Sequence, residues 1–515
     1  MTHGYMFSGS GSNVYVQNLC RALVCGGHEV HLLCQEPDPL SYDFVDAHAT
    51  ADSGGTGVLG ERSTPYPGRC VVYNPVIGDL LPVYVYDEYP GWRVKTFLDL
   101  TQEELDLYLE ANTAALETVA RESGAPAAVT NHSVPGPLIA RRALGGLGVP
   151  YVSIVHGSCL QYVARRSPLY MELAREGLAG ARRILALSRH SAGTIAEDFP
   201  HLAGRTVSFP GGVDTDLFRP DALDPALPRE LRGGAGRGPE QARALLELQE
   251  RGPETTGELA ERLASIAATY DARAHDRDAG ERLERLFAAD GPLVVYVGKL
   301  IHSKGVHVLF QAFARVRRRT GARLLVVGFG TFREALQALT LALGTGDGRL
   351  LSLVARSGRL LEGGVEAPLE HFEPGPGLLR EAEGMHEDVE FIGPLYHEDL
   401  ARLLPAAEVS VVPSIFPETF GLVAAEEAAS GVVPFVANHS GLSEAAAIIG
   451  KGLPFPLAVG MEDFGENLAR ALIKYLGLPE EERRLSRETV RRNCVEHLGW
   501  ERLAGRLVRL CAGEE

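Results

Sequence analysis

The chain has 515 residues, of which 45% are hydrophobic, enough for two or more domains with substantial cores. Its 67 acidic residues outnumber its 50 Lys and Arg residues, and the net charge of -17 disfavours general nucleic-acid binding and broad attraction to anionic lipid. The sequence has no run of 18 apolar residues and no signal peptide at its start, so we expect a cytoplasmic protein without a transmembrane segment, while peripheral membrane contact stays open.

A glycine loop near the start of the chain predicts the first helix. Gly9 and Gly11 precede a helical pattern that runs through residue 24, and residues 29–34 predict the strand that follows. Free N–H groups at a helix N-terminus favour an anion, so a loop of this kind can in principle hold a phosphate. The alternation of strands and helices that continues from here predicts an α/β domain over residues 1–190.

The strand expected before this loop is short. A doubly wound domain normally begins with a full strand that leads into the glycine loop, and here only seven residues precede Ser8. Residues 1–5 resemble the end of such a strand, so we expect a truncated first strand and a translation start upstream. Unpaired backbone groups on the neighbouring strands would then predict poor expression or early melting.

Two strand ends in this half carry polar residues. Residues 152–155 predict a buried strand that ends at His156, while Asn131 and His132, at the end of another strand, are weaker candidates. A lone histidine after a strand is usually structural. Open α/β sheets bind ligands beyond the carboxyl ends of their strands, however, so His156 is a candidate functional residue.

Two stretches interrupt the alternating pattern. Residues 221–290 are rich in Ala, Arg, Glu and Gly and contain too few large apolar residues for a core of their own. We therefore expect a helical insertion on the surface. Residues 346–385 are punctuated by Gly and Pro and form a second insertion, which could serve as a lid or face an acceptor.

The second half of the chain predicts a parallel sheet flanked by helices. Apolar strands alternate with helical patterns, with strands at 292–297, 323–327, 389–392 and 409–414 and helices at 305–318, 333–343 and 397–404. Because the carboxyl ends of parallel strands meet at one edge of the sheet, the residues that follow these strands are candidates for a binding site.

The stretch PETFGLVAAE at 417–426 places two carboxylates across a loop-to-helix junction. Glu418 precedes a helix predicted for 420–430, and Glu426 lies about two turns along it. The N–H groups of the first turn, at Phe420, Gly421 and Leu422, favour an anion. The carboxylates could hold sugar and ribose hydroxyls with a diphosphate between them. An isolated pair of this kind is more often a helix N-terminal charge and a solvated residue.

This stretch is similar to the Glu-x7-Glu motif of retaining glycosyltransferases of family four, which have the two-domain GT-B fold. The stretch VVYVGKLIHSKGVH at 294–307 resembles the strand, basic residue and Lys-Gly of that family, whose two cations grip the donor diphosphate. These cations would be Lys299 and Lys304. The family more often has Arg at the first position, so Lys299 keeps the charge but loses a bidentate fork.

Further segments resemble the same family, at 210–218, 324–330 and 436–444. The resemblance implies the α/β GT-B fold, with two Rossmann-like, doubly wound parallel-sheet domains that face a central cleft. It implies an acceptor-side domain at 1–190, a nucleotide-sugar-binding domain at 191–495 and a C-terminal helix at 496–515 that packs back on the first domain.

The resemblance also implies a function. A hexosyltransferase-like enzyme of this family transfers a sugar from a nucleotide diphosphate sugar to an acceptor hydroxyl with retention of configuration. Glu418 would hold the sugar, Glu426 the ribose, and His156 would orient the sugar from the opposite domain. The implied catalytic residues are Glu418, His156 and Lys304. The implied donor-binding residues are Gly9, Gly11, Lys299, Lys304, Ile392, Phe420, Gly421, Leu422 and Glu426.

We expect neither a cofactor nor a metal, because the lysines and the helix N-terminus would neutralise the diphosphate. Two Asp-x-Asp sequences, at 214–216 and 276–278, mimic a metal motif of a different glycosyltransferase fold, but one lies in the interdomain turn and the other in the first insertion. The seven cysteines lack zinc-ligand spacing and are expected to be buried thiols.

Several alternatives stay open from the sequence. The acceptor could be a phosphorylated polyol, a sugar or a lipid-linked glycan. The function could instead be that of a sugar-nucleotide epimerase or a phosphorylase on the same fold, or of a catalytically silent nucleotide-sugar-binding protein. A dehydrogenase is disfavoured because the loop at Gly9 lacks a third glycine at the right spacing and an acidic partner at the end of the next strand.

Overall fold

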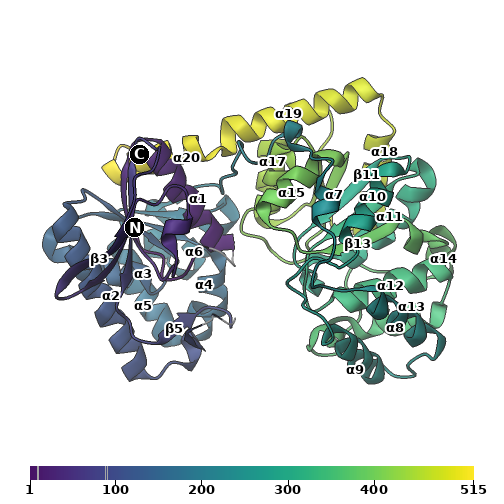
Figure 1. Ribbon diagram of the computed structural model, residues 1–515, viewed down its shortest axis with the longest axis horizontal. Helices are drawn as coiled ribbons and strands as arrows, with labels where there is room; N and C mark the ends of the chain where they lie inside the picture. Colours follow the sequence, from purple (N-terminus) through teal and green to yellow (C-terminus); the bar gives the residue numbers. More distant parts are fainter. Residues whose placement is uncertain (8–10, 87–88, 90) are drawn as a thin grey trace. The chain divides into compact units, whose positions relative to one another are not determined.

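The computed structural model describes residues 1–7, 11–86, 89 and 91–515, which fall into two units (Figure 1). Unit 1 comprises Met1–Gly212 and Leu498–Glu515, and unit 2 comprises Val213–His497. The division therefore lies at 212/213, whereas the sequence suggested 190/191. Helix α6 (Arg189–Asp198) and strand β10 (Thr206–Ser208) belong to unit 1 because β10 pairs in parallel with β9 (Arg183–Ala186).

Unit 1 contains two four-stranded groups, in the orders β1-β4-β2-β3 and β10-β9-β8-β7. All pairs are parallel except the β2–β3 hairpin. The other strands are β1 Glu29–Leu33, β2 Ala47–Asp52, β3 Gly55–Glu61, β4 Arg69–Pro75, β5 Leu80–Val83, β6 Arg93–Thr96, β7 Ala128–Asn131 and β8 Tyr151–Val155. The other helices are α1 Gly11–Cys25, α2 Gln102–Ser123, α3 Gly136–Leu144, α4 Gly157–Tyr162, α5 Pro168–Ala179 and α20 Trp500–Ala512.

Residues 1–3 lie between the two groups of strands. Thr2 forms parallel bridges to Thr130 of β7 and to Leu33 of β1. Its N–H donates to the Val129 carbonyl at 2.9 Å, and the His3 N–H donates to the Leu33 carbonyl at 3.0 Å. The first residues thus join β1 to β7 at the position where the sequence suggested the end of a strand.

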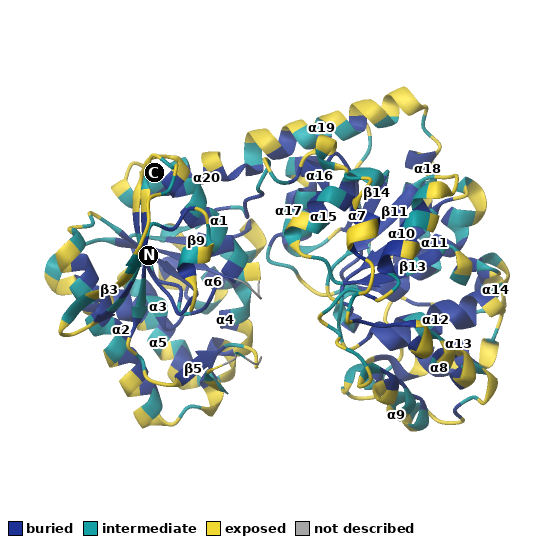
Figure 2. Cartoon of the chain, in the orientation of Figure 1, coloured by how far each residue is buried: buried dark blue, intermediate teal, exposed yellow. Residues whose placement is uncertain are grey.

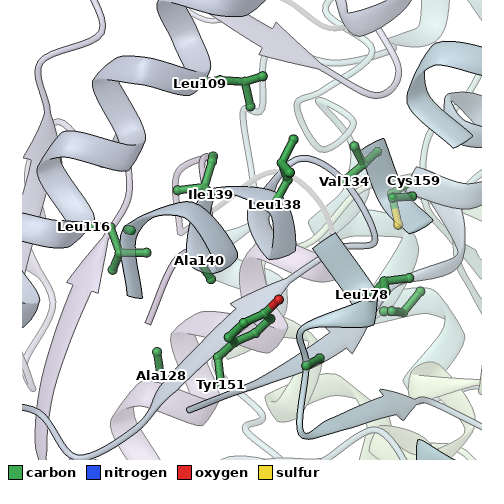
Figure 3. Close-up of a cluster of buried hydrophobic side chains, with 14 of the residues drawn as sticks. Leu109, Leu116, Ala128, Val134, Leu138, Ile139, Ala140, Tyr151, Cys159 and Leu178 are labelled. Atoms are coloured by element: carbon green, nitrogen blue, oxygen red, sulfur yellow. The ribbon is translucent and has the colours of Figure 1, made fainter. Parts of the chain in front are cut away.

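Apolar helix faces cover the sheet of unit 1. All five residues of β8 are buried, as expected for a parallel strand with helices on both faces. Figure 2 shows buried residues inside each unit and exposed residues on the outer faces of its helices. Leu109 and Leu116 of α2 pack with Leu138 and Ile139 of α3 in the main cluster (Figure 3). Helix α2 begins at a capping box, in which Thr101 accepts from the Glu104 N–H and the Glu104 carboxylate accepts from the Thr101 N–H.

The C-terminal helix α20 packs on α1, as the two ends of the colour scale show in Figure 1. The Trp500 and Tyr15 rings meet edge to face with centroids 4.9 Å apart. A Cβ at Gly212 would lie 2.4 Å from Trp500 Cδ2, so only glycine allows this approach. A larger residue at Gly212 would displace the indole from α1.

Unit 2 contains one parallel sheet in the order β13-β12-β11-β14-β15-β16. Its strands are β11 Leu293–Val297, β12 Arg323–Val327, β13 Val389–Gly393, β14 Val409–Val412, β15 Val433–Ala437 and β16 Ala458–Val459. Its helices are α7 Leu227–Glu230, α8 Pro239–Glu250, α9 Thr256–Ala267, α10 Ala279–Ala288, α11 Val306–Thr320, α12 Arg333–Thr345, α13 Gly348–Ser357, α14 Pro376–Ala382, α15 His397–Leu403, α16 Leu422–Ala429, α17 Ser440–Ile449, α18 Phe464–Leu476 and α19 Glu480–Leu498.

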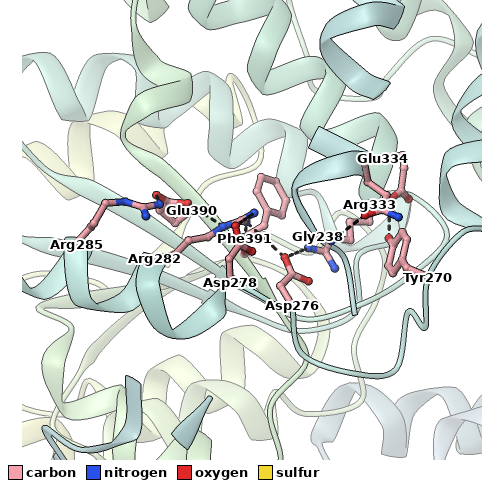
Figure 4. A network of polar contacts seen from close by, with 11 residues as sticks. Gly238, Tyr270, Asp276, Asp278, Arg282, Arg285, Arg333, Glu334, Glu390 and Phe391 are labelled. Carbon is pink, nitrogen blue, oxygen red and sulfur yellow. Dashed lines mark hydrogen bonds and ion pairs between the residues drawn. The ribbon is translucent and has the colours of Figure 1, made fainter. Parts of the chain in front are cut away.

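The first insertion is more than the surface element that the sequence suggested. Its Asp276 N–H donates to the Ile392 carbonyl at 2.9 Å, which ties the insertion to the edge strand β13. The Asp276 side chain has no exposed surface and accepts from Arg333 Nη2 at 2.6 Å, while Arg282 Nη1 donates to the Phe391 carbonyl at 2.5 Å (Figure 4). These buried ion pairs add to apolar residues of the segment that are also buried, among them Leu259 and Leu283.

The second insertion is largely helical. Helix α13 packs on α12 and α9, and α14 packs on α11 and α12. Four large apolar residues of α13 are buried: Leu350, Leu351, Leu353 and Val354. This segment is therefore an integral layer of unit 2.

Candidate functional site

The strand order of unit 2 reverses direction between β11 and β14. From β11 the chain passes to its neighbour β12 on one side, and β14 lies on the other side. Loops at the carboxyl ends of two such strands leave a crevice between them, and open α/β sheets bind ligands there. The loops after β11 and β14 carry most of the residues that the sequence singled out in this half.

These two loops are held close together. The Ile415 N–H of the second loop donates to the Ser303 carbonyl of the first at 3.0 Å. Gly305 has a φ of +66°, and a Cβ there would lie 2.0 Å from the Pro413 carbonyl oxygen. The Lys-Gly sequence of the first loop therefore needs its glycine, which lets the chain turn directly beneath the second loop and begin α11.

The structure brings Lys304 and Glu418 together. Lys304 Nζ forms an ion pair with Glu418 Oε1, and Ser414 Oγ donates to the same oxygen at 2.6 Å. The side chains are 30% and 25% exposed, so both remain accessible to a ligand. Two residues that lie far apart in the sequence thus form one charged site at the strand ends, as expected from their positions after β11 and β14.

The backbone of Glu418 is fixed to the start of α17. Its N–H donates to Ser440 Oγ at 2.9 Å, and its carbonyl accepts from the Gly441 N–H at 3.0 Å. His439 completes this contact: Nε2 donates to the Ser414 carbonyl at 2.7 Å, and Nδ1 lies 2.9 Å from Ser440 Oγ. The sequence pointed to the segment 436–444, but it gave no sign that His439 and Ser440 hold Glu418.

Glu426 lies on α16, one face of which points toward α15. Its Oε1 lies 3.3 Å from Nε2 of His397, at the start of α15. This hydrogen bond is the main reason why the pKa of His397 is raised above its usual value. His397 was not predicted from the sequence, although its position shortly after β13, at the carboxyl edge of the sheet, was a signal that could have indicated it.

The junction before α16 has the geometry expected of a helix N-terminus. Gly421 has a φ of +113° and directly precedes Leu422, the first residue of the helix. A Cβ on Gly421 would lie 2.8 Å from Leu442 Cδ2. Phe420 is buried and anchors the turn from inside, so its contribution to a ligand would come from its backbone.

Two further predicted residues lie nearby with different exposure. Lys299 is exposed in the loop after β11, and its carbonyl accepts from the Tyr296 hydroxyl at 2.8 Å. Ile392 has no exposed surface within β13, and its carbonyl accepts from Asp276. Because the Ile392 side chain faces the core, its predicted part in donor binding would fall to the backbone and to the residues around it.

The candidates in unit 1 lie at the strand ends of its own sheet. His156 follows β8 and is 5% exposed, and its Nε2 lies 3.1 Å from Asn131 Oδ1 at the end of β7. Burial, assisted by the nearby His3, lowers the pKa of His156 to about 3, so this imidazole is neutral near pH 7. Gly11 begins α1 with open space around its Cα, whereas Gly9 lies outside the described residues.

The two Asp-x-Asp sequences have structural contacts. Asp214 Oδ1 accepts from the N–H groups of Asp216 and Leu217 at 3.1 and 3.0 Å, which closes a turn. Asp276 is held by Arg333, as described above. In the part of the chain that the structure describes, no three His, Cys, Asp or Glu residues are arranged to hold a metal ion, and the cysteines form no disulfide. Within the same part, no helix is long and apolar enough to cross a membrane.

A buried carboxyl group lies directly beneath the site. Glu427 has no exposed surface, and its Oε2 accepts from Ser410 Oγ of β14 at 2.7 Å. Burial raises the pKa of Glu427 well above its ordinary value of 4.5, and the neighbouring Glu426 adds to this shift. The folded protein therefore keeps Glu427 protonated under conditions in which the unfolded chain ionises it.

We therefore expect the free energy of unfolding of the Glu427→Gln variant to increase relative to that of the wild type as the pH rises. The pKa of Glu427 is higher in the folded protein than in the unfolded chain, so its contribution to stability is fully present at a pH below the pKa of the unfolded chain. This contribution is lost, at about 1.4 kcal/mol per pH unit, as the pH rises toward the pKa in the folded protein. Denaturant unfolding of both proteins at about pH 5 and about pH 8 measures this difference. The exposed Glu462→Gln is the matched control; equal pH dependence in all three proteins would contradict a protonated Glu427.

Comparison with known proteins agrees with this architecture. Residues 10–212 match the family model of the Glycosyl transferase 4-like domain, and residues 281–351 and 377–491 match that of Glycosyl transferases group 1. An uncharacterized glycosyltransferase of Methanocaldococcus jannaschii is 26% identical over 30% of this chain and 29% of its own length. The D-inositol 3-phosphate glycosyltransferase of Nocardia farcinica is 26% identical over 68% of this chain and 70% of its own length. The first curated relatives are matched over less than a third of their length.

Solved structures share the fold over nearly the whole chain. Sucrose-phosphate synthase from Thermosynechococcus elongatus has a TM-score of 0.53 and 19% identity, covering 99% of this chain and 96% of its own. Anabaena HepE, in complex with UDP and glucose, has a TM-score of 0.54 and 11% identity, covering 99% and 98%. The two family models span most of both units, and with this GT-B fold the chain belongs to the glycosyltransferases of family-four type.

Proposed function

We propose that the protein transfers a sugar from a nucleotide diphosphate sugar to an acceptor hydroxyl, with retention of configuration and without a metal. The observation that carries this proposal is the contact between Lys304 and Glu418 at the reversal point of the sheet, beside the N-terminus of α16. A cation, a carboxylate and free N–H groups in one place suit a ligand that carries both a diphosphate and sugar hydroxyls.

The charges in this site fit the chemistry of the leaving group. When the bond between the sugar and the diphosphate breaks, negative charge grows on the diphosphate. Lys304 and the N–H groups at the start of α16 lie where they can stabilise that charge, and exposed Lys299 supplies a second cation from the same loop as Lys304. In this proposal these groups stabilise the charge of the leaving diphosphate, as a metal ion does in other transferases.

The two carboxylates have separate roles in this proposal. Glu418 exchanges its contacts with Lys304 and Ser414 for hydroxyls of the donor sugar, while His439 and Ser440 keep its backbone in place. Glu426 binds the ribose hydroxyls, and its hydrogen bond with His397 orients it. His156 stays neutral and hydrogen-bonds to the sugar, because a group with a pKa of about 3 carries no proton to donate as an imidazolium.

A donor screen tests this function. The protein is incubated with a panel of uridine, adenosine and guanosine diphosphate sugars, with and without pooled acceptors, and release of nucleoside diphosphate is followed. Relatives whose names contain inositol phosphate or sucrose phosphate make phosphorylated polyols and sugars the first acceptors to try. Release from one donor class that rises with an acceptor supports the transferase. Binding without release would support a silent binding protein instead.

Turnover is expected to survive an excess of EDTA, since fixed positive charges stabilise the leaving diphosphate in this proposal. The measurement is the rate of nucleoside diphosphate release with the active donor, before and after treatment with chelator. Loss of activity that Mg²⁺ or Mn²⁺ restores would overturn the metal-independent mechanism and would return attention to Asp214 and Asp216.

A further inference from the structure

The His156 ring is held by a hydrogen-bond chain that crosses three neighbouring segments. Asn131 Nδ2 donates to the Thr2 carbonyl at 3.0 Å, and Asn131 Oδ1 lies 3.1 Å from His156 Nε2. A carbonyl oxygen can only accept, so Thr2 fixes which end of the amide is the NH₂ group. The amide oxygen must then face His156, and Nε2 must carry the proton that this oxygen accepts.

The other ring nitrogen is consequently an acceptor. His156 is neutral, so the tautomer with the proton on Nε2 leaves a lone pair on Nδ1. Among the described residues, none donates a hydrogen bond to Nδ1. A sugar hydroxyl can donate to this atom, whereas the opposite tautomer would present an N–H and would require an acceptor.

Aromatic rings hold the imidazole in this orientation. The Tyr15 ring meets it edge to face, with centroids 5.2 Å apart, and the His132 ring lies 4.9 Å away. His132 has a φ of +72°, and both of its ring nitrogens are buried without a hydrogen-bond partner among the described residues. It therefore packs against His156 without competing for the Asn131 oxygen.

We infer that Asn131 is a positioning residue, which fixes the Nε2-protonated tautomer of His156 so that Nδ1 accepts a hydrogen bond from a hydroxyl of the donor sugar. The role toward the sugar rests on the proposed function. The assignment of the tautomer rests only on the contacts with Thr2 and Asn131. Asn131 also lies in β7, whose pairing with residues 1–3 a substitution could disturb, so the test needs a signal from the ring itself.

Nitrogen NMR of the full chain with ¹⁵N-labelled histidine supplies that signal, and the His156→Gln spectrum assigns the resonance. We expect the wild-type His156 to show a protonated Nε2 and an unprotonated Nδ1. Asn131→Leu removes the acceptor and is expected to shift the population toward the other tautomer. Asn112→Leu, which removes a different buried amide that bonds within α2, is the control.

The kinetic arm uses the donor found in the screen. Asn131→Leu is expected to lower kcat by about tenfold or more, with a smaller effect on KM. The reason is that a wrongly oriented His156 ring would position the bound sugar less well without greatly weakening its binding. A wild-type Nδ1-protonated tautomer, or the wild-type tautomer retained in Asn131→Leu, would overturn the inference even if activity falls. Failure of every donor would instead overturn the proposed function, and the NMR result would stand by itself.

Discussion

Replacing Lys304 with alanine is expected to lower turnover by about 10²–10³-fold, which is the usual cost of losing one group that stabilises a developing oxyanion. Lys304 is the cation that contacts Glu418 between the two loops, and its stabilisation grows as the diphosphate departs. The measurement is kcat with the active donor, since a group that acts mainly in the transition state affects kcat more than KM.

The matched control for this variant is Lys474→Ala. Lys474 is exposed in the last turn of α18 and loses the same side chain away from the strand ends. Glu418→Gln should be about as harmful as Lys304→Ala, because it removes the charge that both Lys304 and Ser414 contact. Normal kinetics in both site variants would show that the reaction takes place elsewhere.

Asp276→Asn is expected to lower the free energy of unfolding of unit 2 by about 3–5 kcal/mol, the usual cost of removing one partner of a buried ion pair. Asp276 is fully buried against Arg333, which is itself 1% exposed, and Arg333 would be left as an uncompensated buried charge (Figure 4). Arg282 would lose a partner as well, although it keeps Asp278 at 2.9 Å.

Hydrogen exchange measured on peptides from each unit localises this effect. Faster exchange is expected for peptides that contain β13 and α12, while peptides from β8 stay unchanged. Both tryptophans, Trp92 and Trp500, belong to unit 1, so their fluorescence reports the other unit and serves as an internal reference. Glu281→Gln, an exposed partner of Arg232, is the control. Equal exchange in Asp276→Asn and this control would contradict a stabilising buried pair.

The sequence predicted the sheet of unit 2 well because its strands are continuous apolar runs. The expected strand at 292–297 corresponds to Leu293–Val297, and that at 323–327 corresponds to Arg323–Val327. The first insertion was harder to predict, because its buried leucines are spread among charged residues and some of those charged residues are buried too. Asp276 and Arg333 are buried as a pair, and nothing in the local sequence distinguishes such a pair from surface charges.

For the candidate site, the sequence identified single positions better than pairs. Lys304 and Glu418 were both expected at strand ends, and parallel strands bring their ends together. The partners His397, His439 and Ser440 could not be predicted, since each depends on which loop lies beside which. The sequence also did not show which apolar side chains near Ile392 are accessible, because neighbouring positions in a mostly apolar buried strand look alike.

Titration of the full chain with UDP, ADP and GDP in the presence of EDTA tests the central claim most directly, namely that the loops after β11 and β14 hold a nucleoside diphosphate without a metal. We expect one of the three to bind the wild type and Lys474→Ala with equal affinity, and to bind Lys304→Ala at least about tenfold more weakly. Failure of all three to bind, or equal affinity in Lys304→Ala, would contradict the account.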